Sequence, residues 1–177
     1  MRVVSGKYRG KKLKEFNLDS TKPTLDKVKE AMFDMIQFDV VDSIVLDLFS
    51  GTGALGIEAI SRGAKKTFLI DNNPQAIKII KENLKGVTED FDVISQNALE
   101  FLKSTKEKFD VVLLDPPYKT DLGLKAIDIL INDNKLNDNA VILFETSEDL
   151  NINLEYAGFK ITKKKYGTVA VFKMVKQ

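Results

Sequence analysis

Two reactive residue types are absent from this sequence of 177 residues, which contains no cysteine and no histidine. Their absence excludes a zinc site with Cys and His ligands, a cysteine nucleophile and a Ser-His-Asp triad. Any catalysis must therefore use carboxylates, backbone groups, lysines, hydroxyls or a cofactor. We expect that no metal ion is required.

Long apolar segments are missing as well. No apolar run approaches the length of a membrane span, and the first residues lack the charged, apolar and small regions of a secretory signal. We therefore expect a cytoplasmic protein without membrane contact. Because 44% of the residues are apolar, the chain can form one domain with a full core, but it is too short for two. A single domain over residues 1–177 is predicted.

Basic residues are concentrated at one end of the chain, although the net charge is only +1. Such a cluster is typical of a surface that contacts phosphates, and a solvated terminus is the alternative. Lys22, Lys27 and Lys29 could likewise face a polyanion or only solvent. Six cations precede the first acidic residue: Arg2, Lys7, Arg9, Lys11, Lys12 and Lys14.

Strands and helices alternate after this basic segment, which itself suggests one or two short strands or an irregular arm. Apolar residues at helical spacing predict a helix with Thr24 as its N-cap, ending at about residue 38. The alternation that follows predicts an α/β fold with an antiparallel pair at its end. Strands are predicted at 44–49, 67–70, 91–95, 111–114, 140–144, 159–165 and 168–175. Helices are predicted at 57–61, from 74 to about 84, after 98, at 121–131 and at 148–156.

A glycine-rich loop, Ser50-Gly51-Thr52-Gly53-Ala54-Leu55-Gly56, joins the first of these strands to a helix. The glycines allow a ligand to approach the backbone, and the helix N-terminus offers free N–H groups. Asp71 ends the next strand 20 residues after Gly51, the spacing at which a carboxylate reaches a ribose diol. The pattern indicates the adenosine half of a cofactor.

This glycine motif also occurs in nicotinamide dehydrogenases, which are therefore a rival class. The absence of His and Cys, and the short chain after the loop, argue against them. Asp47, just ahead of the loop, favours a methyl donor, because its carboxylate can meet the α-amino group of a methionine moiety. The alternative for Asp47 is an N-cap or a side chain that orders the loop.

The strand at 111–114 leads into Asp115-Pro116-Pro117-Tyr118. Its four apolar residues predict a strand buried on both faces of a parallel sheet, whose ligands lie at the carboxyl ends of the strands. The prolines stiffen the loop and leave carbonyls free to accept hydrogen bonds. A carboxylate, a free carbonyl and an aromatic ring together suit a planar base with an exocyclic NH2 group. A simple strand-ending turn is the alternative.

These motifs resemble a known family. Residues 46–56 together with 115–118 are similar to the class I S-adenosylmethionine-dependent amino-methyltransferases. Residues 1–10, 22–33 and 61–64 resemble the RsmD family of 16S ribosomal RNA (guanine(966)-N(2))-methyltransferases, and the resemblance covers nearly the whole chain. It implies a Rossmann-like, seven-stranded, mostly parallel sheet whose last strand is antiparallel, with helices on both faces. A basic arm and helix over residues 1–40 would precede a cofactor-binding core over residues 41–177.

The resemblance implies methyl transfer from S-adenosylmethionine to the N2 amine of a guanine in 16S ribosomal RNA. The substrate would be the small ribosomal subunit or its assembly intermediate, and the enzyme a monomer. Asp115 and the Pro116 carbonyl would bind the amine, and Tyr118 would stack on the base. Lys22 stands where the family usually has Arg. The implied RNA contacts are Arg2, Lys7, Arg9, Lys11, Lys12, Lys14, Lys22 and Lys27.

The same resemblance assigns cofactor contacts. Asp71 would bind the ribose. Asn97 stands where Asp is commoner, so its amide oxygen would have to accept the hydrogen bond of the adenine amino group. Two alternatives remain: a DNA or RNA adenine-N6 methyltransferase, whose pocket would be similar, and a non-catalytic nucleotide-binding module. The full set of implied cofactor contacts is Asp47, Phe49, Ser50, Gly51, Thr52, Gly53, Asp71, Asn72, Asn97 and Ala98.

Overall fold

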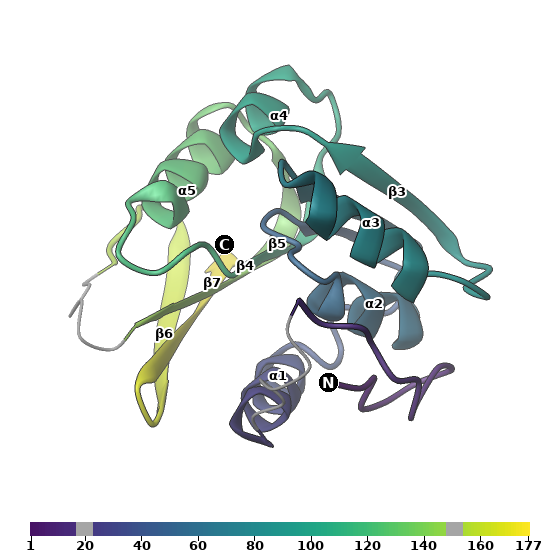
Figure 1. Cartoon of the computed structure of the whole chain (residues 1–177). Helices are drawn as coiled ribbons and strands as arrows, with labels where there is room; N and C mark the ends of the chain where they lie inside the picture. The colour runs from purple at the N-terminus through teal and green to yellow at the C-terminus, as the bar shows by residue number, and fades with distance from the viewer. Residues whose placement is uncertain (17–22, 148–153) are drawn as a thin grey trace.

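A seven-stranded sheet forms the centre of the molecule (Figure 1). The computed structural model describes residues 1–16, 23–147 and 154–177, with side chains from residue 26 onward in the second range. The strand order is β3-β2-β1-β4-β5-β7-β6, and all strands are parallel except β7, which is antiparallel to β5 and β6. The strands are β1 (Ile44–Asp47), β2 (Lys66–Asp71), β3 (Asp90–Ser95), β4 (Phe109–Leu114), β5 (Leu136–Ser147), β6 (Phe159–Tyr166) and β7 (Val169–Lys176).

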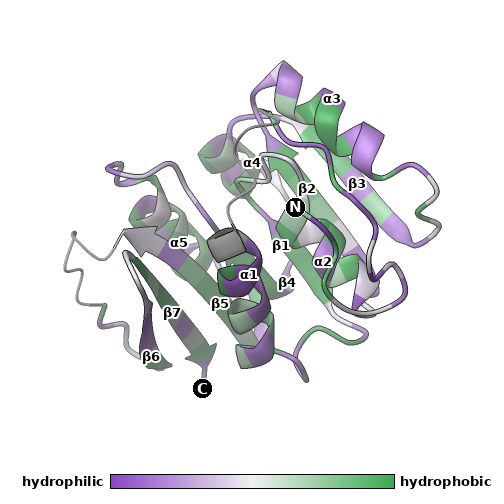
Figure 2. Ribbon diagram, turned by 60° about the horizontal axis from the view of Figure 1, so that its bottom comes forward, coloured by the Kyte–Doolittle hydropathy of each residue, from purple (hydrophilic) through white to green (hydrophobic). Residues whose placement is uncertain are grey.

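Helices cover both faces of this sheet because successive side chains of each buried strand point to opposite sides. Val112 and Leu114 of β4 pack in the layer that includes α4 and α5, whereas Val111 and Leu113 pack in the layer that includes α1 and α2. Figure 2 shows apolar residues along the inner strands. The predicted Rossmann-like arrangement is thereby confirmed. The helices are α1 (Pro23–Met35), α2 (Ala54–Ser61), α3 (Pro74–Asn83), α4 (Ala98–Ser104) and α5 (Leu122–Asn132).

The ends of the helices follow local sequence signals. Pro74 occupies the first turn of α3, and the side chain of Asn73 accepts a hydrogen bond from the backbone N–H of Gln75. At the other end of α2, Gly63 has φ +100°, and its N–H and that of Ala64 bond the last carbonyls of the helix. Within the described ranges, no helix has both the length and the apolar character that crossing a membrane requires.

Several predicted boundaries are wrong. Thr24 is not an N-cap, because α1 already begins at Pro23, a residue preorganised for the first helical position, and it ends at Met35 rather than near 38. β1 ends at Asp47, two residues earlier than predicted. β5 is longer than predicted because its pairing with β7 continues to Ser147. Most of the helix predicted at 148–156 lies outside the described residues, and 154–156 are not helical.

The N-terminal arm folds back on itself and packs on α2. Arg2 and Lys12 form an isolated antiparallel bridge, so the arm is close to the short-strand prediction. The backbone N–H groups of Val4 and Ser5 donate to the carboxylate of Glu58, at 2.8 and 3.0 Å. Since Glu58 is fully buried, these bonds fix the arm against the core rather than leaving it as a free tail.

Candidate active site

A cavity of about 550 Å³ opens at the carboxyl ends of the parallel strands. Its position is the one expected for a ligand site in such a sheet, and its volume is typical of small-molecule sites. Loops after β1, β2, β3 and β4 contribute to its wall, together with Glu145 of β5 and residues of α1. All four predicted catalytic residues and eight of the ten predicted cofactor contacts line it: Asp115, Pro116, Pro117, Tyr118, Phe49, Ser50, Gly51, Thr52, Asp71, Asn72, Asn97 and Ala98.

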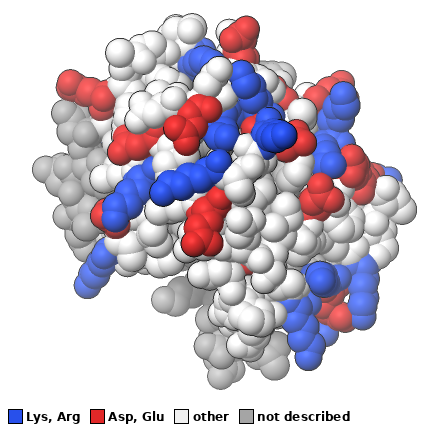
Figure 3. Space-filling model, turned by 90° about the horizontal axis from the view of Figure 1, so that it is seen from above, with Lys and Arg blue, Asp and Glu red and all other residues white. Residues whose placement is uncertain are grey.

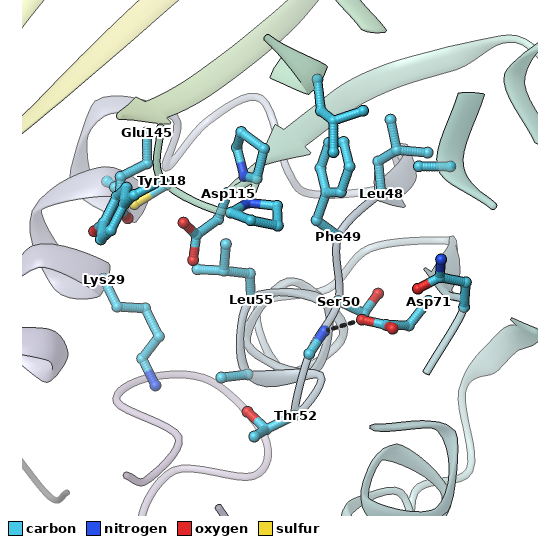
Figure 4. A pocket seen from close by; sticks show the side chains of 18 of the residues that line it. Lys29, Leu48, Phe49, Ser50, Thr52, Leu55, Asp71, Asp115, Tyr118 and Glu145 are labelled. Atoms are coloured by element: carbon cyan, nitrogen blue, oxygen red, sulfur yellow. Dashed lines mark hydrogen bonds between the residues drawn. The ribbon is translucent and has the colours of Figure 1, made fainter. Parts of the chain in front are cut away.

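One end of the cavity is formed by the glycine loop and Asp71 (Figure 4). The two carboxylate oxygens of Asp71 accept backbone N–H bonds from Gly51, at 2.9 Å, and from Asn73, at 2.8 Å. Gly51 has φ +54°, and no atom lies within 4 Å of the position where a Cβ would stand. This open backbone therefore leaves room for a ligand directly above the loop.

The first turn of α2 begins at this loop. No hydrogen bond to the backbone N–H of Ala54 or Leu55 is found within the described part of the chain, and both residues line the cavity. Unpaired N–H groups at a helix N-terminus attract carboxylates and phosphates. Together with the remaining lone pairs of Asp71, which can accept from hydroxyl groups, this end suits an amino-acid carboxylate and a ribose.

Asp47 does not line the cavity, contrary to its predicted contact with a methionine moiety. It is fully buried beneath the loop, where its Oδ2 accepts the backbone N–H of Gly56 at 2.9 Å and its Oδ1 has no partner among the described residues. Burial raises the pKa of Asp47 to about 7, partly offset by the hydrogen bond from the backbone N–H of Gly56, while the Ser50 hydroxyl donates to the backbone carbonyl of Asp47 at 2.8 Å. The alternative role, ordering the loop, is the one that fits. Gly53, the other predicted contact, also lies outside the lining because it packs against Ile57, Leu69 and Ile80.

Asn97 lines the cavity, but its amide oxygen is not free to accept from an adenine. This oxygen caps α4, accepting the backbone N–H groups of Leu99 at 3.0 Å and Glu100 at 3.2 Å. The amide NH2 has no partner in the described ranges, so Asn97 can offer a donor to a ligand and not the acceptor that the sequence predicted.

The other end of the cavity contains two carboxylates and a tyrosine. The hydroxyl of Tyr118 donates to Oε1 of Glu145 at 3.0 Å, whereas Asp115 has no hydrogen-bond partner among the described residues. Asp115 is exposed and lines the cavity, and desolvation by the surrounding protein raises its pKa well above the usual range, helped by the charge of Glu145. Burial also raises the pKa of Glu145, although the bond from Tyr118 partly opposes this rise. Apart from the Tyr118 hydroxyl, which is bonded to Glu145, the three side chains of this end offer acceptors.

The chain is similar to known proteins in sequence and in fold. Residues 1–175 match the model of the family described as Conserved hypothetical protein 95. The chain belongs to this family. It corresponds to the RsmD family, because the chain is 39% identical over 154 residues, 84% of this chain and 80% of the relative, to the Ribosomal RNA small subunit methyltransferase D of Haemophilus influenzae. A relative from Bacillus subtilis named "Putative rRNA methyltransferase YlbH" is 37% identical, covering 98% of both chains.

A solved structure agrees with the family assignment. It is named "Putative methyltransferase" and comes from Escherichia coli; it has a TM-score of 0.90 at 28% identity and covers 100% of this chain and 98% of that one. The family member described here therefore has the class I methyltransferase fold that the sequence predicted.

In this family member Lys29 has a structural position that sequence reasoning missed. Its side chain is only 3% exposed, so Lys29 is not an open surface cation, although it does line the cavity. Its Nζ lies 3.4 Å from Oε2 of Glu58 and donates to the backbone carbonyl of Arg2. Lys29 therefore ties α1 and the arm to α2 beside the cavity. Glu145 was also missed, because no local motif marks it; only the pairing of β4 with β5 brings it to the site.

None of the predicted RNA contacts that the structure describes lines the cavity, and three of them are already bonded within the protein. Lys7 lies 2.5 Å from Glu89, Lys14 lies 3.3 Å from Glu82, and Lys11 donates to the Lys85 carbonyl at 2.8 Å. Lys22 lies outside the described residues. Of the predicted RNA contacts, four are exposed and their side chains have no partner within the described ranges: Arg2, Arg9, Lys12 and Lys27.

Charges elsewhere are mixed. On the face seen in Figure 3, acidic and basic side chains are interspersed, so that face does not present a continuous basic surface. Within the described ranges, no group of three or more His, Cys, Asp or Glu residues could hold a metal ion.

Proposed function

We propose that this protein transfers a methyl group from S-adenosylmethionine to the exocyclic N2 of a guanine in 16S ribosomal RNA. One observation carries the proposal: the glycine loop with Asp71 and the Asp115 to Tyr118 loop line the same cavity. The names of relatives such as the Haemophilus influenzae protein support ribosomal RNA as the substrate. We propose that the whole chain acts as one domain, as a monomer in the cytoplasm.

The cofactor belongs at the end of the cavity formed by Asp71 and the glycine loop. Asp71 is assigned to the ribose hydroxyls, and the N–H groups of Ala54 and Leu55 to the methionine carboxylate. Asn97 is assigned as a donor to an acceptor nitrogen of the adenine, since its oxygen caps α4. When bound, S-adenosylmethionine supplies a methyl group on a positively charged sulfur, which keeps the C–S electron pair when the methyl leaves.

The base belongs at the other end. An exocyclic amine conjugated to its ring is a poor nucleophile. Asp115 and the Pro116 carbonyl would accept its two N–H bonds and hold the nitrogen lone pair toward the methyl group, while Tyr118 stacks on a flipped-out base. The methylated nitrogen must then lose one proton. We assign this proton to Asp115, whose raised pKa makes it a stronger base than an ordinary aspartate.

Identification of the product tests the proposed function. Ribosomal RNA and small subunits from cells that lack the gene are incubated with the protein and labelled S-adenosylmethionine, and the modified nucleoside is identified and mapped. N2-methylguanosine at one position of 16S RNA is expected. N6-methyladenosine would instead support an adenine methyltransferase, and binding of S-adenosylmethionine without transfer would support a nucleotide-binding module. Naked RNA, assembling particles and finished subunits are compared to identify the substrate form.

RNA docking is proposed for the exposed cations of the arm that have no internal partner. Replacing Arg2, Arg9 and Lys12 by Gln should raise KM for RNA. The slope of the logarithm of the binding constant against the logarithm of the salt concentration should become shallower by roughly one for each phosphate that is no longer neutralised. Replacing Lys7, Lys11 and Lys14 by Gln is the matched control, because those lysines are bonded within the protein. A flatter salt dependence in the control alone would reverse this assignment.

A further inference from the structure

Asp115 follows the last residue of β4, and Glu145 lies within the neighbouring strand β5. Leu114 of β4 pairs with Phe144 of β5 in parallel register, so Asp115 and Glu145 are the next residues of the two strands. Neighbouring strands lie about 4.8 Å apart, and residues at matching positions point to the same side of a sheet. Both side chains line the cavity, and Figure 4 shows both at the same end of it, beside Tyr118.

Burial of the Glu145 carboxylate costs free energy of folding. The residue is 7% exposed, and no Lys or Arg lies within salt-bridge distance of it in the described part of the chain. Its Oε1 accepts the Tyr118 hydroxyl at 3.0 Å, while its Oε2 has no partner among the described residues. A buried carboxylate normally has its hydrogen bonds satisfied. The free oxygen at a cavity wall therefore calls for a donor from a bound molecule.

The edges of the two candidate bases differ in what they offer to such a pair of carboxylates. Guanine presents N1–H directly beside its N2 amine, so two neighbouring positions are donors. Adenine presents its N6 amine beside N1, which is an acceptor. An acceptor placed against a carboxylate leaves both groups unpaired and repelling, and sites that use buried polar groups reject such a mismatch strongly.

We propose that Glu145 accepts the N1–H of the target base and so selects guanine over adenine; this inference rests on the proposed function. Asp115 binds the amine that reacts, and Glu145 reads the neighbouring ring position. The charge of Glu145 adds to the desolvation that raises the pKa of Asp115, and burial raises the pKa of Glu145 itself. The hydrogen bond from Tyr118 holds one oxygen of Glu145 and leaves the other for the base.

The test uses 2-aminopurine, which keeps the C2 amine of guanine but has an acceptor at N1. Substrate RNA is ligated from segments with guanine or 2-aminopurine at the target position, and kcat/KM is measured for each. Wild-type protein should prefer guanine by about 10- to 100-fold. Glu145→Gln should bring the two substrates to within about threefold of each other, since an amide can donate to or accept from N1.

Two further variants separate base reading from a structural role. Tyr118→Phe keeps the ring but removes the donor to Glu145, and it should leave the preference for guanine in place. Asp121→Asn, an exposed acid-to-amide change outside the cavity lining, is the control for charge. If Glu145 only holds Tyr118, then Glu145→Gln and Tyr118→Phe will lower transfer to both substrates equally, with an unchanged ratio, and the inference is wrong.

The outcomes also distinguish this inference from the proposed function. Transfer to guanine N2 without discrimination against 2-aminopurine by the wild type overturns the inference alone, and this measurement needs no variant to fold. Transfer to adenine N6 overturns the proposed function and the inference together.

Discussion

The two ends of the cavity differ in how their acceptor oxygens are bonded. At the end of the glycine loop, Asp71 accepts two backbone N–H bonds and Asn97 accepts two more. At the other end, Asp115 has no partner and Glu145 has only Tyr118 within the described part of the chain. Both ends line one cavity, yet only at the end of the glycine loop do both side chains have their acceptor oxygens bonded to backbone N–H groups.

This difference shows how the two ends are prepared for their ligands. Backbone N–H groups hold Asp71 and the loop in one geometry before any ligand binds, which lowers the ordering cost of binding. The end with Asp115 is preorganised in another sense, because most of its acceptor positions have no donor within the described part of the protein and can take one from a ligand. The cofactor, whose carboxylate is an acceptor, fits the end with the glycine loop. The base, whose amine is a donor, fits the end with Asp115.

The largest effect is expected from removing the charge of Asp115. Asp115→Asn keeps the shape and one acceptor, but it should lower kcat by about 10²–10³-fold, as loss of a preorganised electrostatic group does elsewhere. Affinity for S-adenosylmethionine, measured by calorimetry, should be unchanged. Full activity of this variant would refute the role of Asp115 whichever base is modified.

Asp47, which is buried beneath the glycine loop, can be tested through the free energy of unfolding, because its Oδ1 is a buried oxygen without a partner among the described residues. Its pKa is about 7 in the folded protein and 3.8 as the ordinary value, so the folded state holds its proton longer. Stability should therefore fall as pH rises between about 4 and 7, by at most about 1.4 kcal/mol per pH unit from this group, and then level off.

In Asp47→Asn, the free energy of unfolding should not show the part of its fall with rising pH that Asp47 causes. Urea unfolding at several pH values measures it, and the difference from wild type isolates Asp47 because Asp115 and Glu145 titrate in both proteins. Parallel stability curves for the two proteins would contradict the raised pKa.

The role of Asp71 at the end with the glycine loop can be tested by measuring the affinity for S-adenosylmethionine. Asp71→Ala removes the assigned ribose acceptors and the bond that holds the Gly51 N–H, so binding of S-adenosylmethionine should weaken by about 1.5–3 kcal/mol. Asp71→Asn, which keeps an acceptor, should lose less. Calorimetry with S-adenosylmethionine and with NAD provides the measurement, and a preference for NAD would count against the cofactor assignment.

Substitutions of Tyr118 are expected to have the smallest effect. Comparing two of them distinguishes stacking of the ring from the hydrogen bond of the hydroxyl. Tyr118→Ala should cost on the order of 1–3 kcal/mol in kcat/KM if the ring stacks on the base. Tyr118→Phe should be mild, because the ring remains. Equal losses for the two variants would indicate that the hydroxyl bond to Glu145, and not stacking, is what matters.

Much of the fold and of the site could be predicted from the sequence. The glycine loop, Asp71 and the Asp115 to Tyr118 loop all follow apolar strands, and the carboxyl ends of parallel strands meet at one edge. Local rules therefore predicted which loops line the cavity. They could not predict which way an individual acid points: Asp47 is the last residue of β1, and its side chain lies beneath α2.

Contacts between distant parts of the chain decided the rest. Lys29 reads as a surface cation by composition, but pairing with Glu58 buries it. Lys7 is bonded to Glu89, 82 residues away, and is therefore not free to contact RNA. Glu145 becomes part of the site only through the register of β4 against β5. The sequence by itself determined the strand-end chemistry and the family, because these depend on short local patterns. Only the tertiary structure decided which charges are paired, buried or free, because each of those states depends on partners that no local pattern specifies.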